Sequence, residues 1–440
     1  MVPTAPRQRF GLVLATALVV GNIVGSAIFM LPAGLAPYGW NVLSAWAFTA
    51  TGALALAWVF SQLARHFPED GGSFAFMRAG AGRGGAFLGA WGYVVSVWAG
   101  NAAITIAGVS YLTRLLPPLG QTAAGPPIAA LGAIWLLTWV NLRGNRAAGG
   151  VQLVSSVVKL LPFVVVIGLA AWRLMRGQAS ALPPLRSDAF TFAGTSGALS
   201  LTLFSMLGLE SAAVPADAVD RPERTVPAAT MLGTGVSLIV TVIATCAAAL
   251  MLPAAQVSAS KAPISDFIAT SWGDVAGGFV AVAAVVSCFG CLNGWQLLSG
   301  ELPAAMADRA ALPAWFGRRN AGGAAARSIL LGSVVTSLLV LMASSKVGIA
   351  GYNFMALVAT ATSLVMYLLC VLAAARFMRA GRVPRSASLV LAVAVSFVFV
   401  LWAFYGSGRE ALGWGALLIL CGWPVHRLAA RAASATGSLR

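Results

Sequence analysis

Long apolar runs separated by short basic loops are the feature that most limits how this chain can fold. A helix needs about 20 mainly apolar residues to cross the roughly 30 Å hydrocarbon core of a bilayer. Such runs recur along the sequence at 11-36, 41-64, 84-112, 126-142, 147-172, 193-215, 228-252, 275-300, 328-345, 353-375, 387-406 and 411-425. We therefore predict a single all-α membrane domain over residues 1-440 that crosses the bilayer twelve times.

The composition supports this class of fold. Hydrophobic residues make up 59% of the chain and charged residues only 9%, whereas soluble domains carry roughly 25% charged residues. The first apolar run is too long for a secretory signal and has no clear small-residue cleavage site. We expect it to remain in the mature protein.

The net charge of +16 is unevenly distributed over the loops. With the N-terminus inside, twenty of the 28 lysine and arginine residues fall on the same side as that terminus and seven on the other. This asymmetry is the positive-inside signal. We expect both termini to be cytoplasmic, and the basic loops to set topology and contact anionic lipid rather than nucleic acid.

Metal and cofactor sites are not expected. The cysteines Cys246, Cys288, Cys291, Cys370 and Cys421 all fall inside predicted spans, and the two histidines are near loop ends. Cys288 and Cys291 form a CxxC-like pair without a second pair or a histidine, which favours buried apolar cysteines.

The chain also lacks the patterns of an enzyme, an ATP-driven pump or a channel. Gly80, Gly82 and Gly85 match GxGxxG, but no strand precedes them, so we expect a cytoplasmic turn instead of a dinucleotide site. There is no Walker A sequence and no cluster of catalytic side chains. An ion channel would require a continuous polar pore lining, which the spans do not provide.

Two charges lie inside apolar spans. They are Lys159 in VQLVSSVVKLLPFVVV and Glu210 in LTLFSMLGLESAAVP. A charge at the centre of a membrane helix costs about 2.5 to 3.5 kcal/mol, so each is a functional candidate. Lys159 is either a fixed strut capped by carbonyls or a proton carrier, and Glu210 is a candidate proton sensor.

Two spans contain helix-weakening segments. Residues 21-27 read Gly-Asn-Ile-Val-Gly-Ser-Ala and residues 205-211 read Ser-Met-Leu-Gly-Leu-Glu-Ser. Gly21 and Gly25 also fit the GxxxG pattern of close helix packing. However, two broken spans in the two halves of a chain indicate a transporter with its substrate site at the midplane. Broken helix ends suit a substrate with a carboxylate and an ammonium group.

Several motifs together carry a resemblance. GNIVGSAIFMLPAGLA, EDGGSFAFMRAG, GNAAITIAGVSYL, LGLESAAV with RPERTVPAATMLGT, and LNGWQLLSGE resemble the amino acid/polyamine/organocation (APC) superfamily. The sequence is most similar to the bacterial basic amino acid/polyamine antiporters, such as the arginine/agmatine antiporter. These relatives are proteins of the cell inner membrane and are often homodimers.

The resemblance implies a LeuT-like fold with broken spans 1 and 6. It implies two inverted five-helix repeats at about 10-172 and 193-378, followed by helices 11-12 at about 386-426. It also implies a substrate site made of Asn22, Ile23, Gly25, Ser26, Ala27, Asn101, Phe204, Ser205, Leu207 and Trp295.

Individual roles also follow from the resemblance. Ser26 would meet the substrate carboxylate and the carbonyls near Phe204 and Leu207 its amino group, while Tyr93, Phe204 and Trp295 would act in gating. Glu210 and Lys159 would serve proton coupling. Without the resemblance, Tyr93 and Trp295 fit ordinary packing, and Asn22 and Asn101 fit interhelical hydrogen bonds equally well.

Differences from the arginine antiporters affect the substrate. Phe204 replaces a tryptophan, Ala27 a glycine and Ala359 a serine, and Lys159 replaces a small apolar residue. These differences argue against strict guanidinium specificity. We therefore expect a secondary transporter of amino acids or their amine derivatives that works by alternating access as an exchanger. The alternative is proton-coupled uptake of neutral amino acids.

Overall fold

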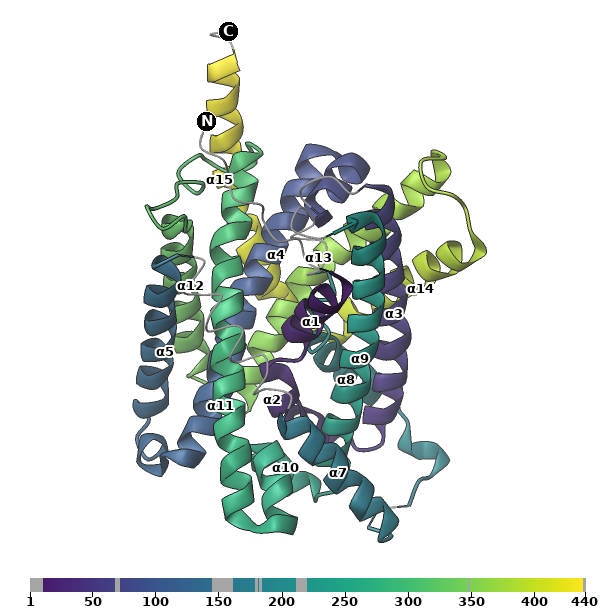
Figure 1. The fold of residues 1–440 in the computed structure, drawn as a ribbon, viewed down its shortest axis with the longest axis vertical. Coiled ribbons are helices and arrows are strands. Elements are labelled where there is room, and N and C mark those ends of the chain that lie inside the picture. The colour runs from purple at the N-terminus through teal and green to yellow at the C-terminus, as the bar shows by residue number, and fades with distance from the viewer. Residues whose placement is uncertain are drawn as a thin grey trace.

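A computed structural model describes residues 11–67, 72–144, 161–178, 181, 184–210, 220–346 and 349–437. In these ranges the chain forms α-helices and short 3-10 helices, and no strand (Figure 1). Each of the twelve expected spans has a helical counterpart, which confirms the all-α prediction.

The first span is divided into two helices, and the other spans follow in order. The α-helices are α1 (Leu12–Ile23), α2 (Ser26–Leu35), α3 (Asn41–His66), α4 (Gly72–Leu115), α5 (Gly125–Leu142), α7 (Leu161–Met175), α8 (Phe192–Phe204), α9 (Pro222–Leu250), α10 (Ala254–Ala259), α11 (Pro263–Asp308), α12 (Ala326–Ala343), α13 (Ala350–Arg379), α14 (Ala387–Gly406) and α15 (Gly408–Gly437). The 3-10 helices are η1 (Ala36–Tyr38), η2 (Pro117–Gly120) and η3 (Ser187–Ala189).

Two helices are much longer than the apolar runs that predicted them. α4 and α11 each bend at a glycine with positive φ, Gly82 at 73° and Gly273 at 80°. Residues before each bend form an additional helical segment. The turn expected in the segment of Gly80, Gly82 and Gly85 corresponds to the bend at Gly82. Gly80 is helical, and a Cβ there would lie 2.3 Å from the Cβ of Ala373, so close packing against α13 explains this glycine.

The fifth and sixth spans are described only in part. α7 begins at Leu161, so Lys159 lies outside the described residues. α8 ends at Phe204, and residues 211–215 of the expected sixth span also lie outside them.

The surface and length of the helices fit a bilayer. Within the described ranges, nine helical segments are long and apolar enough to span it, and α7 and α8 are shorter apolar helices. Many large apolar side chains point outward from the helices. They include Ile128, Leu136, Phe279, Leu338 and Val398. Such side chains are the ones that a lipid environment accommodates.

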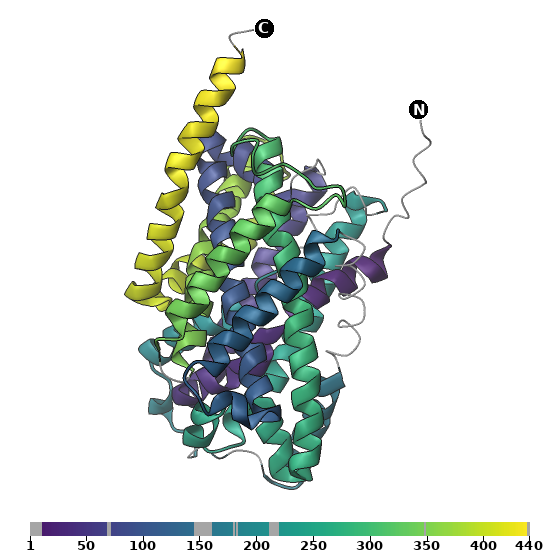
Figure 2. The same cartoon turned by 90° about the vertical axis from the view of Figure 1, so that its left-hand side faces the viewer.

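The interrupted helices α1/α2 and α8 lie at the centre of the bundle (Figure 1). α3 packs against α8, α9 and α14, while α4 packs against α11 and α13, and α5 against α12. α15 runs along one side and extends beyond the bundle (Figure 2). Hydroxyl groups join α3 to α8 in the interior, with 2.7 Å between Thr49 Oγ1 and Thr202 Oγ1. Interhelical hydrogen bonds of this kind help to hold membrane helices in register.

Candidate functional site

The first span is interrupted at Val24 and Gly25. Val24 has ψ of 85°, and Gly25 has φ of −133° and ψ of −148°, so neither continues the α-helix. A Cβ on Gly25 would lie 2.7 Å from the Sγ of Cys291 on α11. Glycine is therefore required here by close approach to a neighbouring helix. The predicted break in the first span is confirmed.

The end of α8 meets this interruption. After Phe204 the chain forms an irregular turn to Glu210, in which Gly208 has φ of 104°. That value lies in the left-handed region, which glycine adopts without strain. A Cβ on Gly208 would be 3.4 Å from both the Cβ and the backbone carbonyl carbon of Asn22. The helix-weakening segments of the two chain halves are thus in contact.

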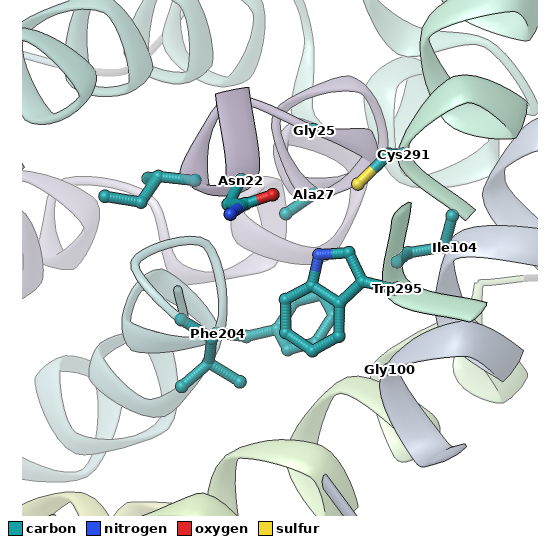
Figure 3. A pocket seen from close by; sticks show the side chains of 10 residues that line it. Asn22, Gly25, Ala27, Gly100, Ile104, Phe204, Cys291 and Trp295 are labelled. Carbon is teal, nitrogen blue, oxygen red and sulfur yellow. The ribbon is translucent and has the colours of Figure 1, made fainter. Parts of the chain in front are cut away.

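A cavity of about 20 Å³ lies between these segments and helices α4 and α11. Its lining residues are Asn22, Ile23, Gly25, Ala27, Gly100, Ile104, Phe204, Leu207, Cys291 and Trp295 (Figure 3). This volume is enough for about one water molecule. Any larger ligand requires the lining side chains to move.

The lining of this cavity is polar only at a few points. None of the described residues that line it carries a charge. The side-chain amide of Asn22 points into it, and the indole nitrogen of Trp295 faces Asn22 and Ala27 (Figure 3). That nitrogen is buried and has no hydrogen-bond partner among the described residues. The site therefore offers an unused donor in an apolar surrounding.

Helix ends supply the remaining polarity. The N-cap of α2 is Gly25, so no side chain at that position caps the first amide groups of the helix. The N-terminus of a helix attracts negative charge, whereas the last carbonyls of α1 and α8 attract positive charge. The two opposite preferences meet around one cavity.

Most of the residues predicted for the substrate site line this cavity. They are Asn22, Ile23, Gly25, Ala27, Phe204, Leu207 and Trp295. Ser26 is the first residue of α2, but its side chain is outside the description. Ser205 follows Phe204 and donates from Oγ to the carbonyl of Thr202 at 2.6 Å. It is not a lining residue.

Asn101 lies behind the cavity wall, in a buried polar network. Its Nδ2 donates to Oε1 of Gln296 at 3.2 Å, while its neighbour Gly100 lines the cavity. Gln296 donates in turn to Thr138 and Ser333, which links four helices. The sequence analysis did not single out Gln296, although it directly follows Trp295.

Glu210 is close to two phenol groups. Its carboxyl is buried, and Oε2 accepts a hydrogen bond from Tyr367 Oη at 2.8 Å. Tyr93 is near enough to interact electrostatically with the same carboxyl. Oε1 makes no hydrogen bond of ordinary geometry with any residue in the described ranges. The sequence analysis identified Tyr93 and Glu210 but missed Tyr367, which comes from a distant helix.

Tyr352 covers another side of the site. Its ring packs edge-on against Phe204, with centroids 6.2 Å apart and an interplanar angle of 83°. Its Oη donates to the carbonyl of Ala27 at 3.4 Å. Ala359, one of the departures from the arginine antiporters, is buried on the same helix and does not line the cavity.

A metal centre is not found in the part of the chain that the structure describes. No group of three histidine, cysteine, aspartate or glutamate side chains is close enough there to hold an ion. None of the described cysteines forms a disulfide with another described residue.

The interrupted helices around a central cavity define a membrane transporter with a LeuT-like fold. The crystal structure of MhsT in complex with L-phenylalanine has this fold, with a TM-score of 0.58 and 15% identity over 90% of this chain and 98% of that chain. The chain belongs to the amino acid permease family, whose sequence profile matches residues 10–419.

Curated relatives are similar along most of their length. The putrescine transporter PotE of Escherichia coli (strain K12) is 30% identical over 432 residues, covering 96% of this chain and 97% of the relative. PotE of Haemophilus influenzae is 29% identical over 428 residues, with the same coverage. The cadaverine/lysine antiporter of E. coli (strain K12) is 32% identical over 342 residues, covering 76% of this chain and 75% of the relative.

Proposed function

We propose that this protein exchanges amino acids for their amine derivatives by alternating access. The observation that carries this proposal is the meeting of two helix interruptions around a cavity that has aromatic walls and no charged residue among its described lining. The relatives that transport putrescine, or exchange cadaverine for lysine, support this substrate class. Lysine and cadaverine differ only by the carboxyl group, so one site must accept both forms.

The proposed binding mode uses the helix ends. The amide groups at the start of α2, with Ser26, would receive a carboxylate, and the last carbonyls of α1 and α8 would receive an ammonium group. The faces of Phe204 and Trp295 would attract the second ammonium of a basic substrate through cation–π interaction. A diamine would use the same aromatic faces without occupying the α2 terminus.

Gating follows from the small size of the cavity. Because the space holds about one water, Phe204 and Trp295 must rotate or shift for a substrate to bind. We assign gating to these two residues and to Tyr93. Tyr352 supports the closed position of Phe204 through its edge-on contact.

Proton coupling is assigned to Glu210 and Lys159. Glu210 is the only charged side chain within the described ranges that is buried. Its carboxyl accepts a hydrogen bond from Tyr367 on α13. Gain or loss of a proton at Glu210 would therefore act directly on that helix. Lys159, as strut or proton carrier, retains the role inferred from its position in the sequence.

The second candidate function is proton-coupled symport of neutral amino acids. The observation that favours it is the lack of a carboxylate among the described lining residues, since a basic side chain would have no opposite charge to pair with. This mechanism would use the same helix ends for the backbone groups of the substrate.

Orientation and assembly complete the proposal. We place both termini in the cytoplasm and the protein in the inner membrane, with the arginine-rich loops against anionic lipid. The inverted repeats at 10-172 and 193-378 are supported by the packing of α3 on α9, α4 on α11 and α5 on α12. We also propose a homodimer, as in the relatives the sequence resembles.

Counterflow in proteoliposomes tests the function. Vesicles loaded with putrescine, cadaverine or agmatine are diluted into labelled ornithine, lysine or arginine, with neutral amino acids as a parallel series. Exchange predicts that a loaded amine accelerates uptake of its parent amino acid without a pH gradient. If the rate of uptake does not depend on the internal amine but increases with an imposed pH gradient, the result would favour the symporter. Uptake of none of these compounds would refute both mechanisms.

A further inference from the structure

A second and larger cavity opens at the end of the bundle where α10 lies, opposite the extension of α15 (Figure 1). We call this cavity of about 320 Å³ the vestibule. It lies between α4, α5, α12, α13 and the segment that joins α10 to α11. Its wall combines apolar side chains, such as Ile106 and Val340, with hydroxyl groups and two lysines.

One side chain of the vestibule lining also contacts residues of the central cavity. Tyr352 lines the vestibule, donates to the carbonyl of Ala27 and packs against Phe204. Ala27 and Phe204 both line the central cavity. A solute in the vestibule is therefore separated from the candidate substrate site by the Tyr352 and Phe204 rings.

The charged residues of the vestibule lining are Lys261 and Lys346. Lys346 Nζ is 2.8 Å from Oε1 of Glu410, which neutralises it. Lys261 is exposed and forms no ion pair with any residue in the described part of the chain. Its backbone is fixed, because its carbonyl accepts a hydrogen bond from Ser110 Oγ at 2.7 Å.

The acidic side chain five residues after Lys261 in the sequence is already engaged. Asp266 accepts a hydrogen bond from Ser260 Oγ at 2.5 Å and pairs with Arg114, whose Nη1 is 3.3 Å from Oδ1. Arg114 also pairs with Asp274 at 3.1 Å. The positive charge of Lys261 therefore remains available to a solute.

The hydroxyl groups of the lining can act as acceptors. Ser110, Thr113, Ser258 and Ser344 each donate their proton to a main-chain carbonyl. These hydroxyl oxygens keep lone pairs, and their residues line the same cavity as Lys261. The vestibule thus combines a cation for a carboxylate, acceptors for an ammonium and apolar wall for an aliphatic chain.

We propose that the vestibule is a docking site for zwitterionic amino acids, with the carboxylate held at Lys261, and that it disfavours diamines. This proposal rests on the exchange function proposed above. A diamine has no carboxylate and is repelled by the same ammonium group. The amino acid would be captured from the side of the membrane to which the vestibule opens. A diamine released on that side would rebind slowly.

The test compares substrates that differ only in the carboxyl group. Lys261→Gln and wild-type protein are assayed with L-lysine and cadaverine, and with L-ornithine and putrescine, in membrane vesicles of both orientations. On the vestibule face, the variant should raise the KM for the amino acids about fivefold, as expected for loss of one charge contact in a partly screened site. The KM for the diamines should stay the same or fall.

Matched variants separate this effect from general charge or structural damage. Lys261→Arg should keep wild-type discrimination. Arg186→Gln removes an exposed cation between α7 and α8 that does not line the vestibule, and should change neither KM. Lys261→Glu should reverse the preference towards diamines.

Four outcomes would overturn the proposal. Equal changes for both members of a pair, or the same change on both membrane faces, would contradict a vestibule site while leaving exchange intact. An unchanged KM in Lys261→Gln would do the same. Wild-type protein that transports neither member of either pair would refute the exchange function, and the vestibule proposal with it.

Discussion

In the proposed binding mode, Phe204 and Trp295 would provide the attraction that a carboxylate provides in many cation sites. Both line the cavity, and the described lining residues include no acidic group. An aromatic face attracts a desolvated cation by about 2 kcal/mol, and less where water has access. In the proposed binding mode, we therefore expect the aromatic pair to set affinity for basic substrates and the helix ends to recognise the groups common to all amino acids.

Substitution at Phe204 should separate these two contributions. Phe204→Leu keeps an apolar side chain but removes the π face, so we expect the Kd for cadaverine or putrescine to rise about fivefold. Phe204→Trp should bind as tightly as wild type or tighter. Isothermal titration of purified protein measures both. If Phe204→Leu and wild-type protein bind the diamine with equal Kd, the ring of Phe204 serves only packing.

Glu210 should control the response of transport to pH. Glu210→Gln cannot ionise, so we expect it to flatten the dependence of flux on pH, as measured in proteoliposomes over a series of symmetric buffers. The groups that face the carboxyl are Tyr93, Tyr367 and Cys370. Tyr367→Phe removes the hydrogen bond to Oε2 and should displace the profile without flattening it.

A matched control for Glu210 is Glu301. Its carboxylate pairs with Arg319 near the surface, with Nη2 2.7 Å from Oε2. Glu301→Gln should keep the wild-type pH profile. If Glu210→Gln also keeps it, another group senses protons.

Cys291 offers a direct probe of the cavity. It lines the cavity with Trp295, whereas Cys421 is exposed on α15. In a Cys421→Ser background, we expect a small thiol reagent to label Cys291 and block transport. Substrate at ten times its Kd should slow this labelling about tenfold, because it leaves about a tenth of the sites free. Labelling at an unchanged rate would place the substrate elsewhere.

At the scale of elements, the interruption of the first span depends on how closely it approaches α11. Gly25→Ala would place a Cβ 2.7 Å from the Sγ of Cys291. Such overpacking costs roughly 1–3 kcal/mol. We expect the variant to lose most transport and to unfold at a lower temperature than wild type.

A second substitution tests the cause of that loss. Cys291→Ala removes the sulfur atom, so Gly25→Ala/Cys291→Ala should recover both transport and thermal stability relative to Gly25→Ala alone. Cys288→Ala is the control, because Cys288 is buried one turn away and is not the atom in contact. Equal rescue by both changes would show a general loosening of α11.

Hydropathy predicted the elements well where their ends coincide with the membrane boundary. α14 occupies 387–406 as expected, because polar residues flank its apolar run directly. α4 and α11 extend past their apolar runs through glycine bends, which hydropathy does not register.

The site was predictable where its signals were local. Gly25, Gly208 and Asn22 stand out in an apolar sequence. In the structure Gly208 approaches Asn22, and Asn22 and Gly25 line the same cavity. Tyr352 and Tyr367 gave no such signal, because a tyrosine in a helix is usual and its partner is determined only by tertiary packing. Asn101 was noticed, but only the structure shows its hydrogen bond to Gln296.

At the scale of the whole molecule, Lys159 is the test of coupling. It lies outside the described residues, but its sequence places a charge in an apolar span. We expect Lys159→Ala to reduce net transport by at least about tenfold while expression stays normal, since a charge there is retained only for a function. Lys159→Arg should show whether charge alone suffices. Wild-type kinetics and pH response in Lys159→Ala would contradict any coupling role.

Tyr352 has a consequence for the evolution of substrate range. One ring forms part of the vestibule and supports the wall of the central cavity. In the proposed mechanism, a mutation there would alter capture and closure together, so we expect laboratory selection for a bulkier substrate to meet a trade-off at this position. Ile349 lines only the vestibule and Leu207 only the cavity. Libraries at those two positions would allow each step to be adapted independently.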